Sequence, residues 1–256
     1  MLKITVLIEN FAPDHLICEH GLSLHLEYNG HFYLLDGGTT GIFTENARRL
    51  GIDLTRVEGA ALSHGHDDHG DGLGAFFRCN PAVRVCARPA AVEPRYMEDD
   101  QGNPFYVGVS QELLHACMDR FDLDDGPRLL APGLHLIPDS VDHEQSLVAE
   151  TDQGLVVMNS CCHAGVDHIV RDILDRFPGQ QVYAVVGGFH LVGKHGMGSL
   201  GVDPETVTSL SRRLVEELGV ERIYTGHCTG LPARQLLSDA EPGHVFPLRT
   251  GDVLVF

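Results

Sequence analysis

The first residues of the chain alternate between apolar and polar side chains, which is the pattern of a strand with one buried face. Four apolar residues share that face: Leu2, Ile4, Val6 and Ile8. Residues 22–28 repeat the alternation, Asn29-Gly30 is a hairpin signal, and residues 31–35 form the expected returning strand. The chain is therefore expected to open with an antiparallel sheet.

Further along, short apolar runs at residues 57–62, 155–158, 182–186 and 222–225 end in loops rich in Gly, His and Asp. Apolar spacing of three and four predicts a helix over residues 166–177. A second helix is expected between the N-cap Asp203, with Pro204 at its first position, and Gly219. Residues 244–248 and 252–256 are interpreted as a closing hairpin. Hairpins mixed with strand–loop–helix units predict an α/β (α+β) fold with helices outside the sheets.

The composition is that of a globular protein, because 43% of the residues are hydrophobic and 21% are charged. The 256 residues are expected to form a single domain, 1–256. Residues 93–128 are interrupted by Pro and Gly and are interpreted as an irregular insertion over one edge, for which a lid is one role. No apolar run approaches the roughly 20 residues that cross a bilayer, so no membrane partner is expected.

Acidic residues outnumber basic ones, 36 Asp and Glu against 18 Lys and Arg, for a formal charge of −18. This charge argues against nucleic acid as a partner, because phosphate binding relies on Lys and Arg. Seven Cys at irregular spacing and an N-terminus without signal-peptide features indicate reduced thiols and a cytoplasmic location. A small-molecule substrate is expected; the oligomeric state is left open.

The 16 His residues are unusually many, and several of them cluster with carboxylates in one loop. After the run at 57–62, His64, His66, Asp68 and His69 fall within six residues. His is the commonest metal ligand and Asp a strong oxygen donor. His163 and His227 each follow another predicted strand. Because ligand sites gather at the carboxyl ends of strands in α/β proteins, the pattern predicts a metal site.

The arrangement His64-x-His66-x-Asp68-His69, with Asp36 after an earlier strand, resembles the metallo-β-lactamase superfamily, which implies a four-layer αββα sandwich. Within that superfamily, four shorter motifs resemble the dihydropterin ribofuranosylaminobenzene-phosphate synthase-like (dihydropteroate synthase-like) branch. They are Glu19-His20-Gly21-Leu22-Ser23, Cys162-His163-Ala164-Gly165, Gly187-Gly188-Phe189-His190-Leu191 and His227-Cys228-Thr229-Gly230.

The resemblance implies two groups of metal ligands. One metal is held by His64, His66 and His163, the other by Asp68, His69 and His227, and Asp36 braces the histidine loop. One feature departs from the hydrolytic members of the superfamily, which carry a bridging Asp after the strand that here ends at Val186. This chain has Gly187-Gly188-Phe189-His190 there. A weaker second metal, no second metal, and a second metal assisted by His190 are the open alternatives.

The leading hypothesis is a metal-dependent hydrolase that uses metal-activated water on a small phosphate- or pterin-bearing substrate. Zn is the expected metal, with Mn or Fe as alternatives. Asp68 and His190 are the candidate catalytic residues, and the alternative roles for His190 are substrate contact, proton donor and auxiliary ligand. Two other functions remain open: a phosphodiesterase or nuclease-like hydrolase, and a metal-dependent binding protein without catalysis.

The remaining candidates are assigned simpler roles. His20 is either a cavity residue or a structural one. The paired Cys161 and Cys162, and Cys228, are expected to be small buried packing residues, although Cys162 and Cys228 each neighbour a proposed ligand. Nine other histidines, His143 among them, are expected to be structural or exposed.

Overall fold

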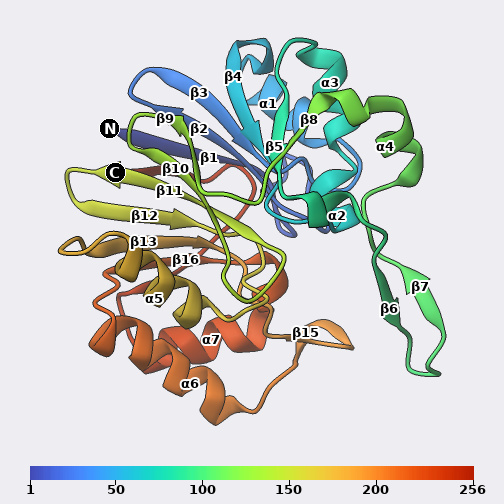
Figure 1. Ribbon diagram of the computed structural model, residues 1–256. Coiled ribbons are helices and arrows are strands. Elements are labelled where there is room, and N and C mark those ends of the chain that lie inside the picture. The colour runs from blue at the N-terminus through green and yellow to red at the C-terminus, as the bar shows by residue number, and fades with distance from the viewer. The chain divides into compact units, whose positions relative to one another are not determined.

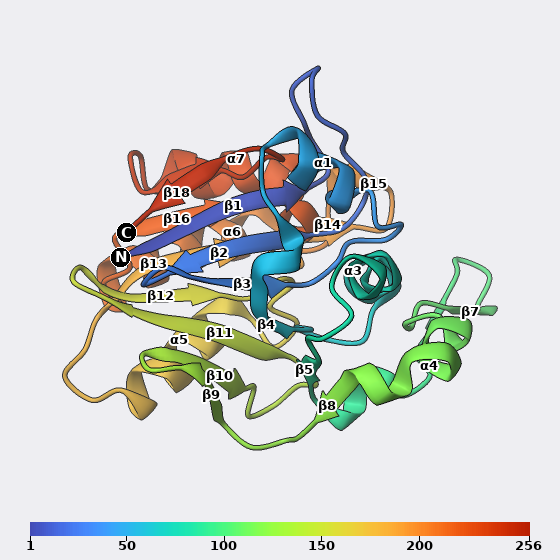
Figure 2. The same cartoon turned by 90° about the horizontal axis from the view of Figure 1, so that it is seen from above.

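The computed structural model describes residues 1–256, which divide into two compact units (Figures 1 and 2). Unit 1 comprises Met1–Gly126, His143–Gln145 and Arg249–Val255, and unit 2 comprises Pro127–Asp142, Ser146–Leu248 and Phe256. Each unit contains one seven-stranded sheet together with helices, so the expected mixed α/β class is confirmed. The single domain over 1–256 stays a prediction. None of the helices is long and apolar enough to cross a membrane.

The sheet of unit 1 has the strand order β18-β1-β2-β3-β4-β5-β8. Its strands are β1 (Leu2–Ile8), β2 (Ser23–Tyr28), β3 (His31–Leu35), β4 (Val57–Ala61), β5 (Val85–Ala87), β8 (Phe121–Leu123) and β18 (Val253–Val255). From β18 to β3 the neighbours are antiparallel, and from β3 to β8 they are parallel. The predicted hairpin is confirmed, because Asn29 (φ 53°) and Gly30 (φ 84°) turn β2 into β3. Because β3 and β4 are parallel neighbours, their carboxyl ends lie side by side.

The helices of unit 1 bury an apolar cluster with that sheet, in which Phe43, Leu62 and Phe76 are fully buried. Each such side chain contributes roughly 1.5–3 kcal/mol. The helices are α1 (Phe43–Arg49), α2 (Asp67–Gly70), α3 (Leu73–Cys79) and α4 (Gln111–Cys117), with 3-10 turns η1 (Leu54–Arg56), η2 (Pro89–Val92) and η3 (Met118–Arg120). Residues 93–128, expected to be irregular, contain α4, the edge strand β8 and the hairpin β6 (Tyr96–Glu98)–β7 (Pro104–Tyr106), which projects in Figure 1.

The sheet of unit 2 has the order β17-β16-β13-β12-β11-β10-β9. Its strands are β9 (Arg128–Ala131), β10 (Leu134–Pro138), β11 (Gln145–Thr151), β12 (Gly154–Met158), β13 (Val182–Gly187), β16 (Arg222–Thr225) and β17 (Val245–Pro247). Strands β12, β13, β16 and β17 are parallel, which brings the carboxyl ends of three of the four predicted strand runs to one edge. A small hairpin, β14 (Val192–Gly193) and β15 (Gly196–Leu200), follows β13.

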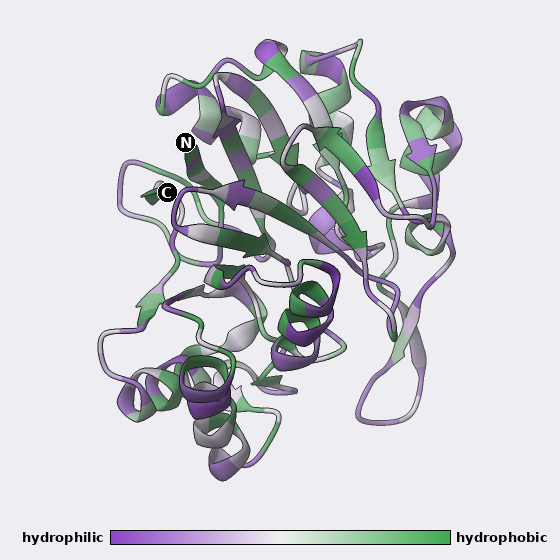
Figure 3. Ribbon diagram, turned by 60° about the vertical axis from the view of Figure 1, so that its left-hand side comes forward, coloured by the Kyte–Doolittle hydropathy of each residue, from purple (hydrophilic) through white to green (hydrophobic).

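The helices of unit 2 pack their apolar faces on the sheet, with Ile169, Val170 and Leu214 in the core. They are α5 (Val166–Arg176), α6 (Pro204–Arg212), the π-helical turn η4 (Arg213–Glu217), the 3-10 turn η5 (His227–Thr229) and α7 (Leu231–Ala240). Both predicted helices are confirmed, and Asp203 caps α6 by accepting from the Thr206 N–H at 2.9 Å. In Figure 3 the helices carry both hydropathy colours, as amphipathic helices do.

The predicted closing hairpin is wrong. Strand β17 pairs parallel with β16 in the sheet of unit 2, whereas β18 pairs antiparallel with β1 in the sheet of unit 1. The backbone of Gly251 and Asp252 already bonds to Val6 before β18 begins. Two apolar runs separated by a short turn satisfy the hairpin pattern, but the alternation cannot tell which sheet offers each run its partner.

Candidate metal centre

In unit 1, the histidine loop (residues 63–70) leaves the end of β4 and enters the short helix α2. His64 and His69 are fully buried. Nε2 of His64 lies 3.0 Å from Nδ1 of His66, and the ring centroids of His64 and His69 are 4.3 Å apart. His66 is extended (φ −95°, ψ 151°) and precedes the first turn of α2, which carries Asp68 and His69. The loop therefore brings three imidazoles and a carboxylate together, as the residue spacing predicted.

Asp36 follows β3 and anchors the histidine loop through hydrogen bonds. Its Oδ1 accepts from the Ser63 backbone N–H at 2.7 Å, and its Oδ2 accepts from the Ser63 hydroxyl at 2.7 Å and lies 2.9 Å from Nδ1 of His69. All three residues are buried. A carboxylate on one ring nitrogen orients an imidazole and increases the basicity of the other nitrogen. Asp36 is thus placed to direct Nε2 of His69 toward a ligand.

Asp68 lies at the border of the buried loop. Its Oδ2 is 3.1 Å from Nε2 of the exposed His20 and 3.6 Å from Nε2 of His69. The other ring nitrogen of His20, Nδ1, lies 3.3 Å from the Asn10 side-chain amide, so both roles left open for His20 stay predictions. Burial, and after it the charge of Asp68, raise the pKa of the neighbouring Asp67. The carboxylates of α2 are therefore close enough to oppose one another's ionisation, a cost that a cation would relieve.

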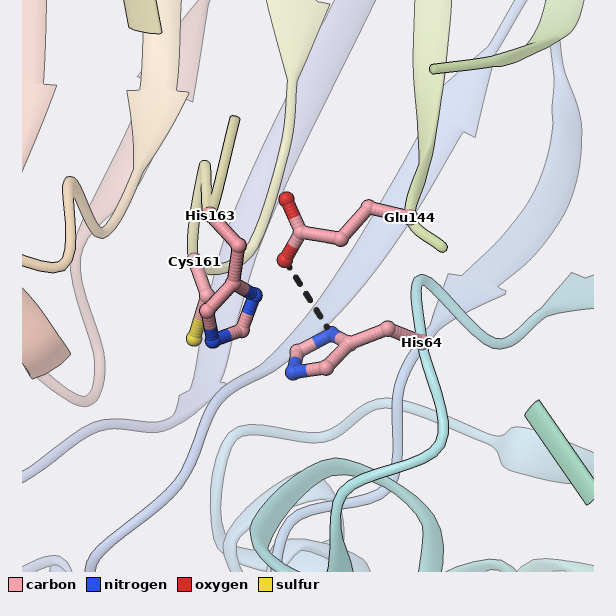
Figure 4. A group of neighbouring side chains, drawn as sticks. All are labelled: His64, Glu144, Cys161 and His163. Atoms are coloured by element: carbon pink, nitrogen blue, oxygen red, sulfur yellow. Dashed lines mark ion pairs between the residues drawn. The ribbon is translucent and has the colours of Figure 1, made fainter. Parts of the chain in front are cut away.

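Two residues without a predicted role also meet the histidine loop. Oε1 of the fully buried Glu144 lies 3.5 Å from Nδ1 of His64, the ion pair drawn in Figure 4. The ring of His143 lies 5.6 Å from that of His64 and 5.5 Å from that of His66. His143, which was expected to be structural or exposed, adjoins the candidate ligands. The only sequence signal was a His-Glu pair directly before a strand.

In unit 2, three loops leave the ends of the adjacent parallel strands β12, β13 and β16, and each carries a histidine. They are His163, His190 and His227, of which His227 is fully buried and His190 is exposed. The rings of His163 and His190 are 4.3 Å apart. Figure 4 draws His163 together with Cys161 in the loop after β12. The ends of these three strands therefore lie at one edge of the sheet of unit 2.

The backbone of these loops is strained in a way that marks functional sites. Cys162 (φ 54°), His190 (φ 48°) and His227 (φ 46°) adopt left-handed conformations that side chains other than Gly disfavour. Such residues cost of order 1–3 kcal/mol each and persist where the surroundings hold them. Asn159 helps to hold Cys162 in this conformation, because its Oδ1 accepts from the Cys162 backbone N–H at 2.8 Å.

The loop after β13 has no space for a bridging aspartate at Gly187. A Cβ there would lie 1.7 Å from the carbonyl oxygen of Asn159, and Gly187 has a φ of 144°. A Cβ at Gly188 would lie 2.5 Å from Sγ of Cys228. A side chain therefore fits at neither Gly187 nor Gly188 without a shift of the surrounding atoms.

Cys228 has an unusual environment for a packing residue. The His190 backbone N–H donates to its Sγ at 3.2 Å. Burial raises the pKa of this thiol, but its hydrogen bond with Cys161 and the nearby His227 and His190 outweigh burial and hold the pKa well below the usual range. A thiol in these surroundings is prepared to act as a thiolate.

The donor atoms fit a borderline divalent cation. Unit 1 offers imidazole and carboxylate donors, and unit 2 offers imidazole and thiol donors. Zn²⁺ is bound by these three donor types, and imidazole also suits Fe and Cu. The six ligands implied by the resemblance carry only imidazoles and one carboxylate. The structure places the thiols of Cys161 and Cys228 near some of these side chains as further possible donors.

The chain is similar to several known proteins. The family model described as the metallo-beta-lactamase superfamily matches residues 18–227. A 7,8-dihydropterin-6-methyl-4-(beta-D-ribofuranosyl)-aminobenzene-5'-phosphate synthase from Methanocaldococcus jannaschii is 27% identical, over 100% of this chain and 97% of its own length. An uncharacterised protein from the same organism is 24% identical over 94% of this chain and 97% of its own.

Among solved structures, a metal-dependent hydrolase of the beta-lactamase superfamily is 26% identical. It covers 100% of this chain and 99% of its own, with a TM-score of 0.80. The Zn²⁺-bound PqqB of Methylobacterium extorquens has a TM-score of 0.62 at 14% identity, over 99% of this chain and 100% of its own, and so shares the fold.

Proposed function

Because the chain belongs to the metallo-β-lactamase superfamily, we propose that it is a metal-dependent enzyme that hydrolyses a small phosphate- or pterin-bearing substrate. The observation that carries this proposal is the histidine loop with Asp36 bonded to both Ser63 and His69. A buried carboxylate that orients an imidazole is the arrangement that metal sites use around their ligands.

The proposed ligands are the six implied by the family resemblance. His64, His66 and His163 hold one cation, and Asp68, His69 and His227 hold a second. Zn²⁺ is the first choice, and Mn and Fe are alternatives, because His and Asp donors accept all three. When bound, such a cation supplies Lewis-acid chemistry, since it lowers the pKa of water toward neutrality and polarises a phosphoryl oxygen.

Three side chains of the protein have proposed roles beside the cations. Asp36 holds the His69 ring in one orientation, which keeps the histidine loop arranged before substrate arrives. Asp68 lies at the border of the loop beside the exposed His20. From there its carboxylate can bind a cation and can accept a proton from a substrate. His190 is exposed next to His163 and is the proposed proton donor to a leaving group, or a substrate contact.

The substrate class follows from the relative's name and from charge. The Methanocaldococcus synthase is named for a dihydropterin and a phosphate ester joined in one compound, and we propose that this chain acts on a molecule bearing one or both groups. The formal charge of −18 counts against a polynucleotide, and hence against a nuclease.

A second candidate is a synthase-type reaction in which the amine of an aromatic phosphate ester attacks the 6-methylene carbon of a dihydropterin. The new C–N bond forms as the C–O bond to a phosphate or diphosphate leaving group breaks, and the amine loses a proton. One observation favours it: the named synthase is similar over the full length of this chain. Neither Gly187, which ends β13, nor Gly188 has room for a side chain, and the absence of an aspartate there agrees with a departure from simple hydrolysis. The same donors would serve both reactions.

A panel of phosphomonoester, phosphodiester, lactone and thioester probes tests the hydrolase proposal. We expect turnover of a phosphate ester by the wild type, and its loss in His66→Ala but not in His115→Ala, which removes an exposed histidine from α4. Turnover that survives in His66→Ala would remove this site from consideration. Coupling of a dihydropterin methyl phosphate or diphosphate ester to an aromatic amine, with none of the four probes hydrolysed, would favour the synthase reaction.

A further inference from the structure

We propose that unit 2 carries a sulfur-rich cation site of its own, formed by Cys161, His190 and Cys228, which takes a thiophilic divalent cation such as Zn²⁺ or Cd²⁺. Cys161, as well as Cys228, is here a ligand and not a packing residue. The site uses none of the six ligands proposed for the hydrolase, although the Cys161 sulfur also lies within 4.8 Å of ring nitrogens of His163 and His227. It shares only His190 with the proposed catalytic residues. It rests on donor atoms and not on the proposed reaction.

The fold delivers one donor from each of three neighbouring strands. Cys161 follows β12, His190 follows β13, and Cys228 lies in η5 after β16. These strands are adjacent and parallel, so their carboxyl ends meet at one edge of the sheet. Donors that are up to 67 residues apart in sequence are therefore brought together by the sheet, which is how ligand sites arise in α/β architectures.

The donor atoms lie at a spacing that a single ion can bridge. The two sulfurs and a ring nitrogen of His190 all lie within 4.8 Å of one another. The Cys228 thiol donates to the backbone carbonyl of Cys161 at 3.7 Å, and the backbone N–H of His190 donates to the same sulfur at 3.2 Å. A tetrahedral ion about 2.3 Å from each sulfur holds its donors within about 4 Å of one another, so a small side-chain adjustment closes the site.

The surrounding backbone holds these donors in place. A side chain at Gly188 would collide with Sγ of Cys228, so the loop after β13 must pass directly over the sulfur. The left-handed conformation of His190 turns its N–H onto that same sulfur at 3.2 Å. Strain of this kind persists only where several contacts hold it, and here the contacts converge on Cys228.

The site is buried at its sulfurs and open at its imidazole. Cys161 and Cys228 are 3% and 4% exposed, whereas His190 is an exposed residue. A cation can therefore enter from the His190 side and reach sulfurs that bulk solvent scarcely touches. Two thiolates with one imidazole select for soft and borderline cations over Mg²⁺ and Ca²⁺, and leave a fourth position for an outside ligand.

Cobalt(II) is the probe, because thiolate coordination gives it a charge-transfer absorption in the near ultraviolet that nitrogen and oxygen donors do not give. The purified full chain is treated with a chelator, dialysed, and titrated with Co²⁺. We expect this absorption in the wild type and in Cys162→Ser, the matched variant that removes an adjacent buried thiol outside the site. It should be lost in Cys161→Ser and in Cys228→Ser.

His190→Ala keeps the test decisive if a buried cysteine variant fails to fold, because His190 is exposed. It should bind Co²⁺ at least roughly tenfold more weakly at the sulfur site. No sulfur absorption in the wild type, absorption unchanged in a folded Cys228→Ser, or Co²⁺ affinity unchanged in His190→Ala would overturn the proposal. His66→Ala should keep the absorption while losing turnover, so failure of the proposed function is distinguished from failure of this site.

Discussion

Asp36 is the residue on which the histidine loop depends most directly. It sits in a left-handed conformation (φ 61°) after β3, fully buried, with its carboxylate shared between Ser63 and His69. Asn has the same shape and tolerates this backbone conformation, so Asp36→Asn removes the charge with little added strain.

We expect Asp36→Asn to bind metal roughly 10- to 100-fold more weakly than the wild type, because the His69 ring loses the carboxylate that orients it. Competition with a chromophoric chelator measures this affinity. Asp53→Asn is the matched control, since Asp53 caps η1 in an exposed position. Equal affinities in the wild type and Asp36→Asn would show that Asp36 does not support the ligands.

A second residue-scale effect concerns pH and the fold of unit 1. Burial, and then the charge of Lys3, lower the pKa of His25 from 6.5 to about 4. The unfolded chain therefore binds a proton at His25 between pH 6.5 and about 4 that the folded chain does not bind. Stability from this residue is present above pH 6.5 and is lost as the pH falls through that window.

His25→Phe keeps the ring that stacks on Phe32 but removes the titrating group. We expect the loss of unfolding free energy between pH 7 and pH 4.5 to shrink by on the order of 2 kcal/mol, measured by urea denaturation at both pH values. His115→Phe, on the exposed face of α4, should leave the pH dependence as it is. A pH dependence unchanged in His25→Phe would contradict the assignment.

Residue-scale prediction was possible where the signal was local. His64, His66, Asp68 and His69 lie within one loop, so their chemistry is visible in the sequence. Glu144 and Cys161 were missed for the opposite reason, because a single glutamate or cysteine in a loop has no local pattern that separates a ligand neighbour from a packing residue. Only the folded chain shows what each of them contacts.

At the scale of elements, the turn after β13 packs closely against the sulfur of Cys228. Gly188 is held where any side chain would meet Sγ of Cys228 and the carbonyl of Ser160. Gly198 in β15 provides a natural comparison, because nothing lies within 4 Å of the position of its Cβ. The two glycines are ten residues apart, and only one of them is enclosed.

We expect Gly188→Ala to lower the free energy of unfolding by about 1–3 kcal/mol, because the loop must shift to admit the methyl group. Gly198→Ala should change it by less than about 0.5 kcal/mol. Urea denaturation of both variants beside the wild type gives the comparison. If the two substitutions had equal effects, the close contact between Gly188 and Cys228 would not exist in solution.

The sequence predicted which helices and strands exist more accurately than it predicted which strands pair. Short-range periodicity and capping account for β1, the β2–β3 hairpin, α5 and the Asp203 cap of α6. The pairing of β17 and β18 does not, because both runs are short and each joins a different sheet. Partner choice depends on which sheet edge is available, and that is a long-range property.

For the whole molecule, the fold class is confirmed: the chain has the mixed α/β fold of the metallo-β-lactamase superfamily. Its formal charge of −18 exceeds what any two divalent cations could neutralise, so most of the acidity serves purposes other than metal binding. A surface of this sign disfavours polynucleotides and leaves small substrates as the expected class.

The central claim is that the histidine loop binds a metal, and elemental analysis of protein purified without added metal tests it most directly. We predict at least about one equivalent of Zn, Mn or Fe in the wild type and in His115→Ala, a clear reduction in His66→Ala, and a lower melting temperature after chelation, since binding to the folded state stabilises it. Less than about half an equivalent of any transition metal, with a melting temperature unchanged by chelation, would contradict the account.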